Sequence, residues 1–196
     1  MEPPELVLAS NNPGKLREIA ALLSMQVIPQ AQLGIAEAEE PHATFLENAL
    51  AKARHASRAA RLPALADDSG LCVEALGGAP GVNSAYYAGR EGGREQRDAR
   101  NNEKLLRNLS DNRRAYYCCV VVLLRHAEDP RPLVAEGIWH GEIARAARGS
   151  NGFGYDPIFF IPEIRKTAAE LDPAQKNRMS HRGKALAQLL EKLKQC

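Results

Sequence analysis

Residues 6–24 read LVLASNNPGKLREIAALLS, and this stretch decides the fold class. The apolar run Leu6–Ala9 predicts a short buried strand, because a polar turn of Ser-Asn-Asn-Pro-Gly follows it directly. Residues Lys15–Ser24 predict a helix, because their leucines and isoleucine recur at helical spacing. The chain therefore opens with a strand, a turn and a helix, which is typical of an α/β fold.

The remainder of the chain continues to mix strands with helices. Residues Thr44–Ala60 predict a helix that begins at a capping box of Thr44 and Glu47. The short strand Ala64–Ala66 leads into Asp-Asp-Ser-Gly, so we expect two acids at the carboxyl end of that strand. This order predicts an α/β fold, with a mixed sheet flanked by helices. The other predicted elements are strands at 26–28, 115–125, 132–143 and 158–161, an extended segment at 71–76, helices at 95–109 and 181–195, one or two helical turns at 166–171, and an N-cap at Asp172 before Pro173.

Composition limits the class of protein. The 196 residues predict a single domain over 1–196, and 26 basic against 24 acidic residues argue against a disordered polyelectrolyte or a generic nucleic-acid binder. The longest apolar run, 118–124, is far shorter than the roughly 20 residues of a spanning helix, and the first residues lack a basic signal-peptide region. We therefore expect a cytoplasmic protein without a membrane anchor. The cysteines lack metal-ligand spacing and are expected to be buried thiols: Cys72, Cys118, Cys119 and Cys196.

The turn Ser10–Lys15 is the first candidate site. A strand-to-helix turn presents backbone N–H groups and the positive end of a helix, which suit a phosphate, and Lys15 adds a charge. It is not a P-loop, because the leading glycine is missing and Leu16 stands where Ser or Thr would bind Mg²⁺. The structural alternative is an ordinary turn with a surface lysine.

Two acidic segments are candidates for a metal or a general base. The pair Asp67–Asp68 could bind Mg²⁺ or activate water, although it could equally be a solvated turn. Glu39–Glu40 could be a surface loop, or could supply a second carboxylate to the same cation.

Two further segments could recognise a nucleoside. In GSNGFGYDP, residues 149–157, Phe153 and Tyr155 could stack on a base, or could simply fill the core. Lys176 and Ser180–Gly183 could form a second anion or base-edge site, or could be ordinary helix capping with solvated charges. The combination of basic helix entries, acids and an aromatic loop predicts a site for a nucleoside triphosphate with Mg²⁺.

At this point the chain resembles a known family, the inosine triphosphate pyrophosphatases, and most closely its bacterial branch. The resemblance extends from Leu8 to about Leu190. It is carried by motifs in a fixed order: ASNNPGK (9–15), TFLENALAKA (44–53), ADDSGL (66–71), LGGAPGVNSA (76–85), NNEKLL (101–106), GFGYDPIF (152–159), KTAAEL (166–171) and SHRGKAL (180–186). Two positions depart from the bacterial pattern, Tyr86 in place of Arg and Ala147 in place of Pro.

The resemblance implies two lobes around a long, bent, mixed sheet with the active cleft between them, and a homodimer. It implies Mg²⁺-dependent hydrolysis of ITP, dITP and XTP between the α- and β-phosphates, which keeps these nucleotides out of DNA and RNA. Asp68 would accept the proton of the attacking water, Lys15 and Lys52 would contact the phosphates, and Glu40 with Asp68 would hold the metal. The implied substrate contacts are Ser10, Asn11, Asn12, Pro13, Gly14, Lys15, Ser69, Phe153, Gly154, Tyr155, Asp156, Lys176, His181 and Arg182.

Selectivity would depend on the purine 6-position, where a donor such as Arg182 or a backbone N–H would donate a hydrogen bond to an oxygen but could not pair with an amine. On this interpretation the small net charge is the sum of a cationic cluster, formed by Lys15, Lys52, Lys176 and Arg182, and acidic surface elsewhere. The alternatives are a pyrophosphatase for modified pyrimidine triphosphates, a nucleotide-binding module without turnover, and an RNA-binding module, which the composition does not favour.

Overall fold

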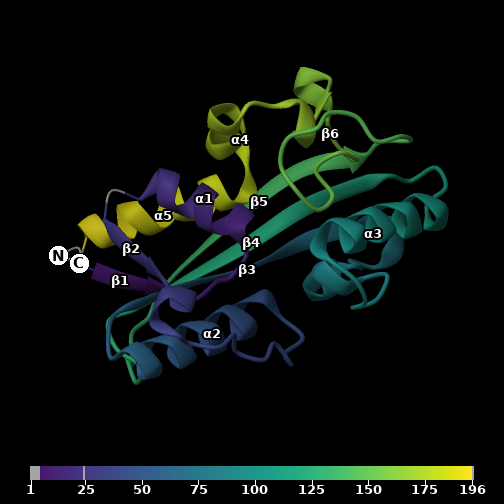
Figure 1. Cartoon of the computed structure of the whole chain (residues 1–196). Helices are drawn as coiled ribbons and strands as arrows, with labels where there is room; N and C mark the ends of the chain where they lie inside the picture. The colour runs from purple at the N-terminus through teal and green to yellow at the C-terminus, as the bar shows by residue number, and fades with distance from the viewer. Residues whose placement is uncertain (1–4, 24, 196) are drawn as a thin grey trace. The chain divides into compact units, whose positions relative to one another are not determined.

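The strands form one mixed sheet of seven strands, in the order β2-β1-β3-β4-β5-β6-β7. The computed structural model describes residues 5–23 and 25–195, so predictions that include Ser24 and Cys196 extend outside the described residues. Helices flank the strands, as the sequence predicts (Figure 1). The strands are β1 (Glu5–Leu8), β2 (Gln26–Pro29), β3 (Ala64–Val73), β4 (Arg114–Leu124), β5 (Leu133–Ile143), β6 (Phe159–Ile161) and β7 (Lys166–Thr167). The helices are α1 (Pro13–Leu22), α2 (Phe45–Ala60), α3 (Arg94–Asn108), α4 (Pro173–Met179) and α5 (His181–Lys194).

The chain divides into two compact units, and each has its own hydrophobic core. The described residues of the first unit are 5–23, 25–68, 119–137 and 181–195. In it β1 pairs in parallel with β2 and with β3, and α1 packs with α5. Figure 1 shows α1 and α5 on one side of these strands and α2 on the other. Its core is aliphatic, with Leu6, Leu8, Ile19 and Leu65 almost completely buried.

The second unit comprises residues 69–118 and 138–180. Its core contains most of the buried aromatic side chains, among them Tyr117, Trp139 and Phe159. Strand β6 pairs antiparallel with β5 and with β7. The unit also contains 3₁₀ segments, including Gly81–Tyr86 and Ala168–Glu170.

The helix ends follow the predicted capping chemistry. Thr44 is the N-cap of α2, since its Oγ1 accepts from Glu47 N at 3.2 Å and donates to Glu47 Oε2 at 2.6 Å. Asp172 caps α4 in the same way and accepts from Gln175 N at 2.8 Å, with Pro173 at the first helical position. Both caps fix the start of a helix that contributes to a candidate site.

Two predicted elements differ from the structure, the first at its end and the second over residues 166–167 only. Strand β3 does not end at Ala66 but runs through the Asp-Asp-Ser-Gly sequence to Val73, so Asp67 and Asp68 lie inside a strand and not at its carboxyl end. Residues 166–171, predicted as helical turns, begin as β7 and only then form a 3₁₀ turn. In both places pairing and burial in the sheet override local propensity.

Candidate active site

Asp67 is the centre of a buried ion-pair network in the first unit. Its Oδ2 lies 2.9 Å from Lys15 Nζ and 3.3 Å from both Nε and Nη2 of Arg182. Arg182 also bonds to Glu18 of α1 through its Nη1. The Asp67 side chain is completely buried and Arg182 is 2% exposed. The network therefore links α1, β3 and α5 by charge as well as by packing.

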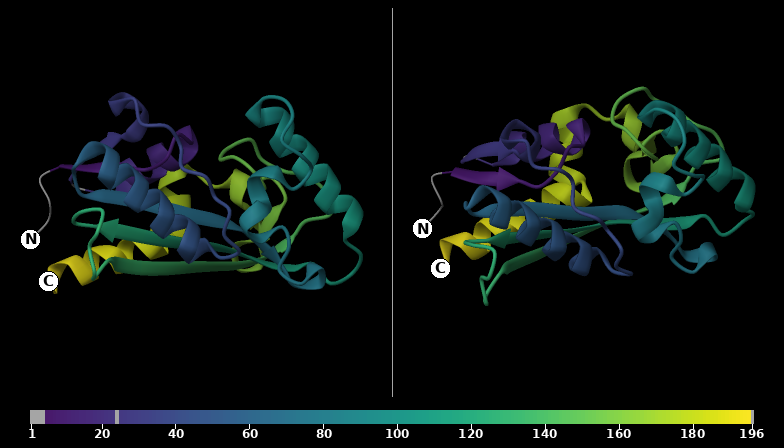
Figure 2. Two further views of the ribbon diagram at one scale, coloured as in Figure 1. Left: turned by 90° about the horizontal axis from the view of Figure 1, so that it is seen from below. Right: turned by 60° about the horizontal axis from the view of Figure 1, so that its bottom comes forward.

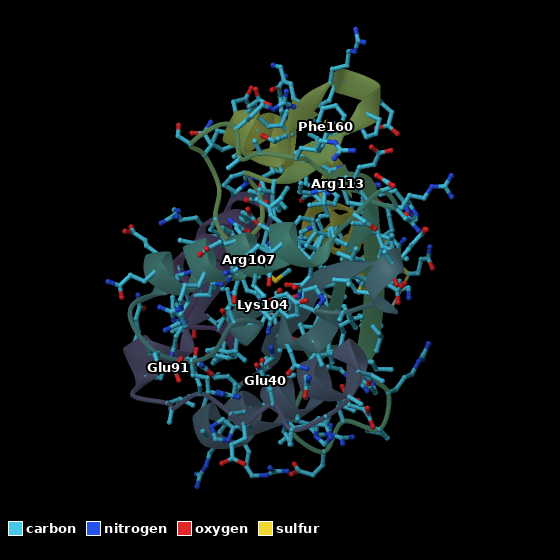
Figure 3. The ribbon with its side chains drawn as sticks, turned by 90° about the vertical axis from the view of Figure 1, so that its right-hand side faces the viewer. Glu40, Glu91, Lys104, Arg107, Arg113 and Phe160 are labelled. Carbon is cyan, nitrogen blue, oxygen red and sulfur yellow. The ribbon has the colours of Figure 1, made fainter. Side chains whose placement is uncertain are left out.

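Asp68 meets a different set of partners, because successive side chains of a strand leave it on opposite faces. Lys52 Nζ lies 3.2 Å from Asp68 Oδ1 and 2.5 Å from Glu40 Oε1, and Asn48 Nδ2 donates to Asp68 Oδ2 at 3.2 Å. Lys52 and Asn48 are on the buried face of α2, and Glu40 is in the loop that precedes this helix (Figure 3). Glu40 and Asp68, predicted as partners for one cation, thus both contact Lys52, and their binding of a metal stays a prediction.

The two neighbouring carboxyl groups differ in their pKa. Burial alone would raise the pKa of Asp67, but the charges of Lys15 and Arg182 hold it well below the usual range of an aspartate. Burial also raises the pKa of Asp68, and there the charge of Lys52 only partly offsets it. Burial would lower the pKa of Lys52, but the carboxylates of Asp68, Asp67 and Glu40 keep it raised. Asp67 is therefore a permanent anion, and Asp68 is the more basic of the pair.

The turn at 10–15 is an N-cap as well as a candidate phosphate site. Asn12 Oδ1 accepts from Gly14 N at 2.9 Å and Lys15 N at 3.1 Å, and Ser10 Oγ accepts from Asn12 N at 3.2 Å. Asn11 Oδ1 accepts from Gln30 Nε2 at 3.3 Å. Several amides predicted to bind phosphate are thus already bonded within the turn, and Pro13 has no N–H. In this structure the turn offers phosphate the cation of Lys15 more directly than its amides.

The aromatic loop belongs to the second unit. Asp156 Oδ2 accepts from Phe153 N at 2.8 Å and lies 2.5 Å from Lys176 Nζ, and this Nζ lies 4.7 Å from the centre of the Phe153 ring. The Phe153 side chain is half-buried. Asp156 and Lys176 are buried, and their contacts stabilise the conformation of the loop. The structure therefore brings Phe153, Asp156 and Lys176 together, and their predicted contacts with a nucleoside stay predictions.

Other predicted contacts of the nucleoside lie in the interior. Tyr155 is 4% exposed and donates its hydroxyl to Ser84 O at 2.8 Å, which is the core-filling alternative. His181 is 4% exposed at the first position of α5, next to Arg182 in the Asp67 network. Ser69 is half-buried in β3 beside Asp68. Base contacts from Tyr155, His181 and Arg182 stay predictions.

The expected cationic cluster is corrected by these contacts. Each of its four members lies against a carboxylate: Lys15 on Asp67, Lys52 on Glu40 and Asp68, Lys176 on Asp156, and Arg182 on Asp67 and Glu18. Part of the acidic charge is thus paired with these cations in the interior, while other acidic side chains, such as Glu103, Asp111 and Glu128, are exposed. The reason is desolvation, because a charge is retained in the interior only when it is paired.

Several residues of the site were not predicted from the sequence. They are Glu18, Asn48, Asp67 as a partner for two cations, and Arg94, Asp98 and Asn102 of α3, which contact the aromatic loop. Asn48 and Asn102 lie inside motifs on which the family resemblance rests, and their amide groups were the available signal. Asp67 also lies in such a motif, but its partners could not be read from it. Glu18, Arg94 and Asp98 are charged helix residues that a sequence assigns to solvated surface by default.

The carboxylates of Glu40 and Asp68 fit a hard divalent cation. Both point at one positive charge, the ammonium of Lys52, so they already converge on a cation. Mg²⁺ is commonly held by one or two carboxylates together with water and substrate phosphates. In the part of the chain that the structure describes, no group of three or more His, Cys, Asp or Glu side chains is arranged to hold a metal. The donors present therefore suit Mg²⁺ bound together with a phosphate ligand better than a permanent metal centre.

Comparison with known proteins adds four similarities. A sequence model described as the Ham1 family matches residues 6–192. The chain is 64% identical over 193 residues to a dITP/XTP pyrophosphatase of Burkholderia pseudomallei (strain K96243), covering 96% of this chain and 92% of that protein. It is 62% identical over 194 residues to a dITP/XTP pyrophosphatase of Ralstonia nicotianae (strain ATCC BAA-1114 / GMI1000), covering 96% of each. A solved HAM1 protein from Coxiella burnetii matches with a TM-score of 0.89 and 49% identity, covering 98% of this chain and 99% of that one.

Proposed function

The chain belongs to the Ham1 family, and from that premise we propose that it is a pyrophosphatase of non-standard purine nucleoside triphosphates. It hydrolyses ITP, dITP and XTP to the monophosphate and pyrophosphate, and so removes them from the nucleotide pool. The observation that carries this function is 64% identity to a dITP/XTP pyrophosphatase across 96% of the chain, with Asp68, Lys52 and Glu40 in mutual contact. The resemblance seen in the sequence motifs is thereby confirmed.

Asp68 is the general base of the proposed mechanism. One proton of the attacking water passes to its carboxylate while the water oxygen bonds to the α-phosphorus. The bond from that phosphorus to the bridging oxygen breaks, and the electron pair leaves with pyrophosphate. Burial raises the pKa of Asp68, which makes it a better proton acceptor than an exposed aspartate. Its contact with Asn48 fixes the orientation of the carboxylate.

Lys15 and Lys52 bind the phosphate oxygens and offset their charge. Both lysines are held by carboxylates before substrate arrives, so their charge is already in place when charge develops on the leaving group. Glu40 and Asp68 would hold Mg²⁺, which supplies Lewis-acid stabilisation of the phosphate charge. Ser10–Gly14 and Ser69 complete the proposed contacts with the phosphates.

Phe153, Gly154, Asp156 and Lys176 bind the nucleoside, with the Phe153 ring stacked on the base. The donors of Arg182 face Asp67 and Glu18, which favours a backbone N–H as the group that recognises the 6-oxygen. An amine at this position leaves the donor unpaired, which costs about 1–3 kcal/mol and gives up to ~100-fold discrimination against ATP.

Steady-state pyrophosphate release from ITP, XTP, GTP, ATP, UTP and TTP with Mg²⁺ tests the substrate class. We expect ITP and XTP to exceed ATP in kcat/KM by about 100-fold. A tenfold preference for UTP or TTP over ITP and XTP would support the pyrimidine alternative and reject the purine assignment.

Asp68→Asn tests whether the chain turns over its ligand. Hydrolysis of ITP should fall by about 10²–10⁴-fold, whereas ITP binding, followed by calorimetry, should weaken by no more than about tenfold, because Glu40 still provides a carboxylate for the metal. Asp111→Asn is the control, because the Asp111 side chain is fully exposed. Binding of ITP by the unaltered protein with no turnover would indicate a binding module.

The proposed enzyme is a homodimer that acts in the cytoplasm, where nucleoside triphosphates are used. Within the described residues, no helix is long and apolar enough to cross a membrane. Sedimentation equilibrium should give twice the chain mass of 21.4 kDa. A single-chain mass at micromolar concentration would refute the dimer without affecting the assigned reaction.

A further inference from the structure

Side chains of helix α3 form hydrogen bonds with both the backbone N–H and the backbone carbonyl of Gly154. Asp98 Oδ2 accepts from Gly154 N at 3.0 Å, and Asn102 Nδ2 donates to Gly154 O at 3.0 Å. The two side chains are four residues apart and so lie on the same face of the helix. Figure 2 shows α3 beside the loop that follows β5, and all of these residues belong to the second unit.

The same face of α3 also contacts the aromatic ring next to this glycine. The guanidinium of Arg94 lies 5.0 Å from the centre of the Phe153 ring, within the range of a cation–π contact. Arg94 Nε is 3.9 Å from Asp98 Oδ2, the oxygen that binds Gly154 N. The carboxylate of Asp98 therefore contacts both the guanidinium that lies over the Phe153 ring and the backbone N–H of the next residue, Gly154.

The hydrogen bond from Asn102 to Gly154 leaves the other polar atom of the Asn102 amide unpaired among the described residues. Its Oδ1 is buried and has no hydrogen-bond partner within the described residues, while its Nδ2 serves Gly154. An acceptor left in this way is destabilising, and an apolar residue would avoid the cost. Local costs of this kind are expected where a side chain is kept for function, which here is the position of the loop.

We propose that Arg94, Asp98 and Asn102 are positioning residues that set the pose of Phe153 and Gly154, and through it the choice of base. This rests on the proposed function, in which Phe153 stacks on the base. The three residues do not touch the reacting phosphates, so they act on recognition of the nucleoside and not on the hydrolytic step. Loosening them should therefore affect KM and base preference more than kcat.

The test measures kcat and KM for ITP and ATP, with the inhibition constant of pyrophosphate as a readout that needs no base. For Asp98→Ala and Asn102→Ala we expect KM for ITP to rise about tenfold, kcat to change less than twofold, and the ITP-to-ATP ratio of kcat/KM to fall by about tenfold. The pyrophosphate constant should not change. Arg107→Ala is the control, since Arg107 lies on α3 with its side chain 69% exposed (Figure 3).

Two more variants separate positioning from a merely structural role. Asp98→Asn keeps an oxygen acceptor for Gly154 N and should restore most of the base preference lost in Asp98→Ala. Arg94→Ala removes the cation that lies over the Phe153 ring and leaves the bonds of Asp98 and Asn102 to Gly154 in place, and should weaken ITP preference by about 3-fold. It remains usable if Asp98→Ala or Asn102→Ala fails to fold, which thermal melting reports.

The outcomes are distinguishable from failure of the proposed function. If the unaltered protein shows no preference for ITP over ATP, the proposed function and this inference both fail. If it prefers ITP and the folded variants keep that preference, only the inference is overturned. An equal loss of ITP and pyrophosphate binding would also overturn it, because the effect would then be general.

Discussion

Asp67 and Asp68 are adjacent in β3, yet their environments assign them opposite tasks. Replacing Asp67 by Asn removes the anion that Lys15 and Arg182 share in the interior. We expect the free energy of unfolding to fall by about 3 kcal/mol, because breaking a buried pair leaves buried charge uncompensated. Urea denaturation at pH 7, with pyrophosphate release as a parallel assay, measures the change.

Asp68→Asn is the matched variant at the next position. Folding raises the pKa of Asp68, so its ionised form gains no stability from folding and a neutral amide is tolerated. Lys52 also keeps Glu40 as a partner. Asp68→Asn should therefore change the free energy of unfolding by less than about 1 kcal/mol while abolishing hydrolysis. Equal destabilisation by the two variants would contradict this division of roles.

The partners of individual side chains, such as those of Asp67 and Asp68, could not be predicted from the sequence. The acid pair at 67–68 could be singled out as a candidate site from the sequence, because adjacent carboxylates after an apolar run are uncommon in a core. Which of the pair binds which cation could not be predicted. The partners come from α1, α2 and α5, up to 115 residues away along the chain, and only the folded sheet decides which face each meets.

At the scale of elements, the turn between β4 and β5 is held by one aspartate. Asp129 accepts from Arg125 N at 3.0 Å, Arg125 Nε at 2.8 Å and Arg131 N at 2.9 Å, and it is 1% exposed. These bonds, first among them that of the Arg125 side chain, hold the pKa of Asp129 well below its usual range. The bonds require the ionised form, so the turn should depend on pH.

The sign follows from linkage. A carboxylate whose pKa is lowered by folding contributes stability above its unfolded pKa of about 3.9, and loses it as pH falls toward the folded value. Asp129→Asn should therefore lower the free energy of unfolding by about 1–3 kcal/mol at pH 7. The gap to the unaltered protein should narrow below about pH 4.

Glu128→Gln is the control for this prediction, because Glu128 is next in the chain but 72% exposed, with an exposed partner in Arg58. It should change stability by less than about 0.5 kcal/mol. Chemical denaturation across pH 3–7 measures all three proteins. A difference between Asp129→Asn and the unaltered protein that stays constant with pH would show that shape, and not charge, holds the turn.

Most elements could be predicted because the spacing of their apolar residues and the capping or turn residues at their ends indicate the same structure. The helix at 45–60 and the strands at 114–124 and 133–143 differ from prediction by one residue at most. The predicted end of β3 at Ala66 is wrong because Asp, Ser and Gly have low strand propensity. Burial in the sheet keeps these residues extended. The strand at 166–167 could not be predicted because it pairs with the short strand β6, and two paired residues leave no recognisable alternation of apolar and polar side chains.

At the scale of the whole molecule, a net charge of +2 conceals charges that are balanced inside each site. In the first unit three cations, Lys15, Lys52 and Arg182, face four carboxylates, so the network has a formal charge of −1. Sequence counting expected an excess of positive charge here. A triphosphate carries about four negative charges near neutral pH, so it would meet a site of the same sign.

This balance predicts that nucleotide binding itself, and not only hydrolysis, requires a divalent cation. One Mg²⁺ would change the network from −1 to +1 and would favour the anion. Calorimetry with a non-hydrolysable ITP analogue, methylene-bridged between the α- and β-phosphates, should give a Kd at least ~10-fold weaker in chelator than in Mg²⁺.

Glu40→Gln provides the internal comparison. Removing one carboxylate makes the metal-free network neutral, so the variant should bind the analogue better than the unaltered protein in chelator. It should also bind it less well in Mg²⁺, because a metal ligand is lost. If the unaltered protein binds the analogue equally in Mg²⁺ and in chelator, the lysines alone suffice for the phosphates, and Glu40 has no part in holding a metal.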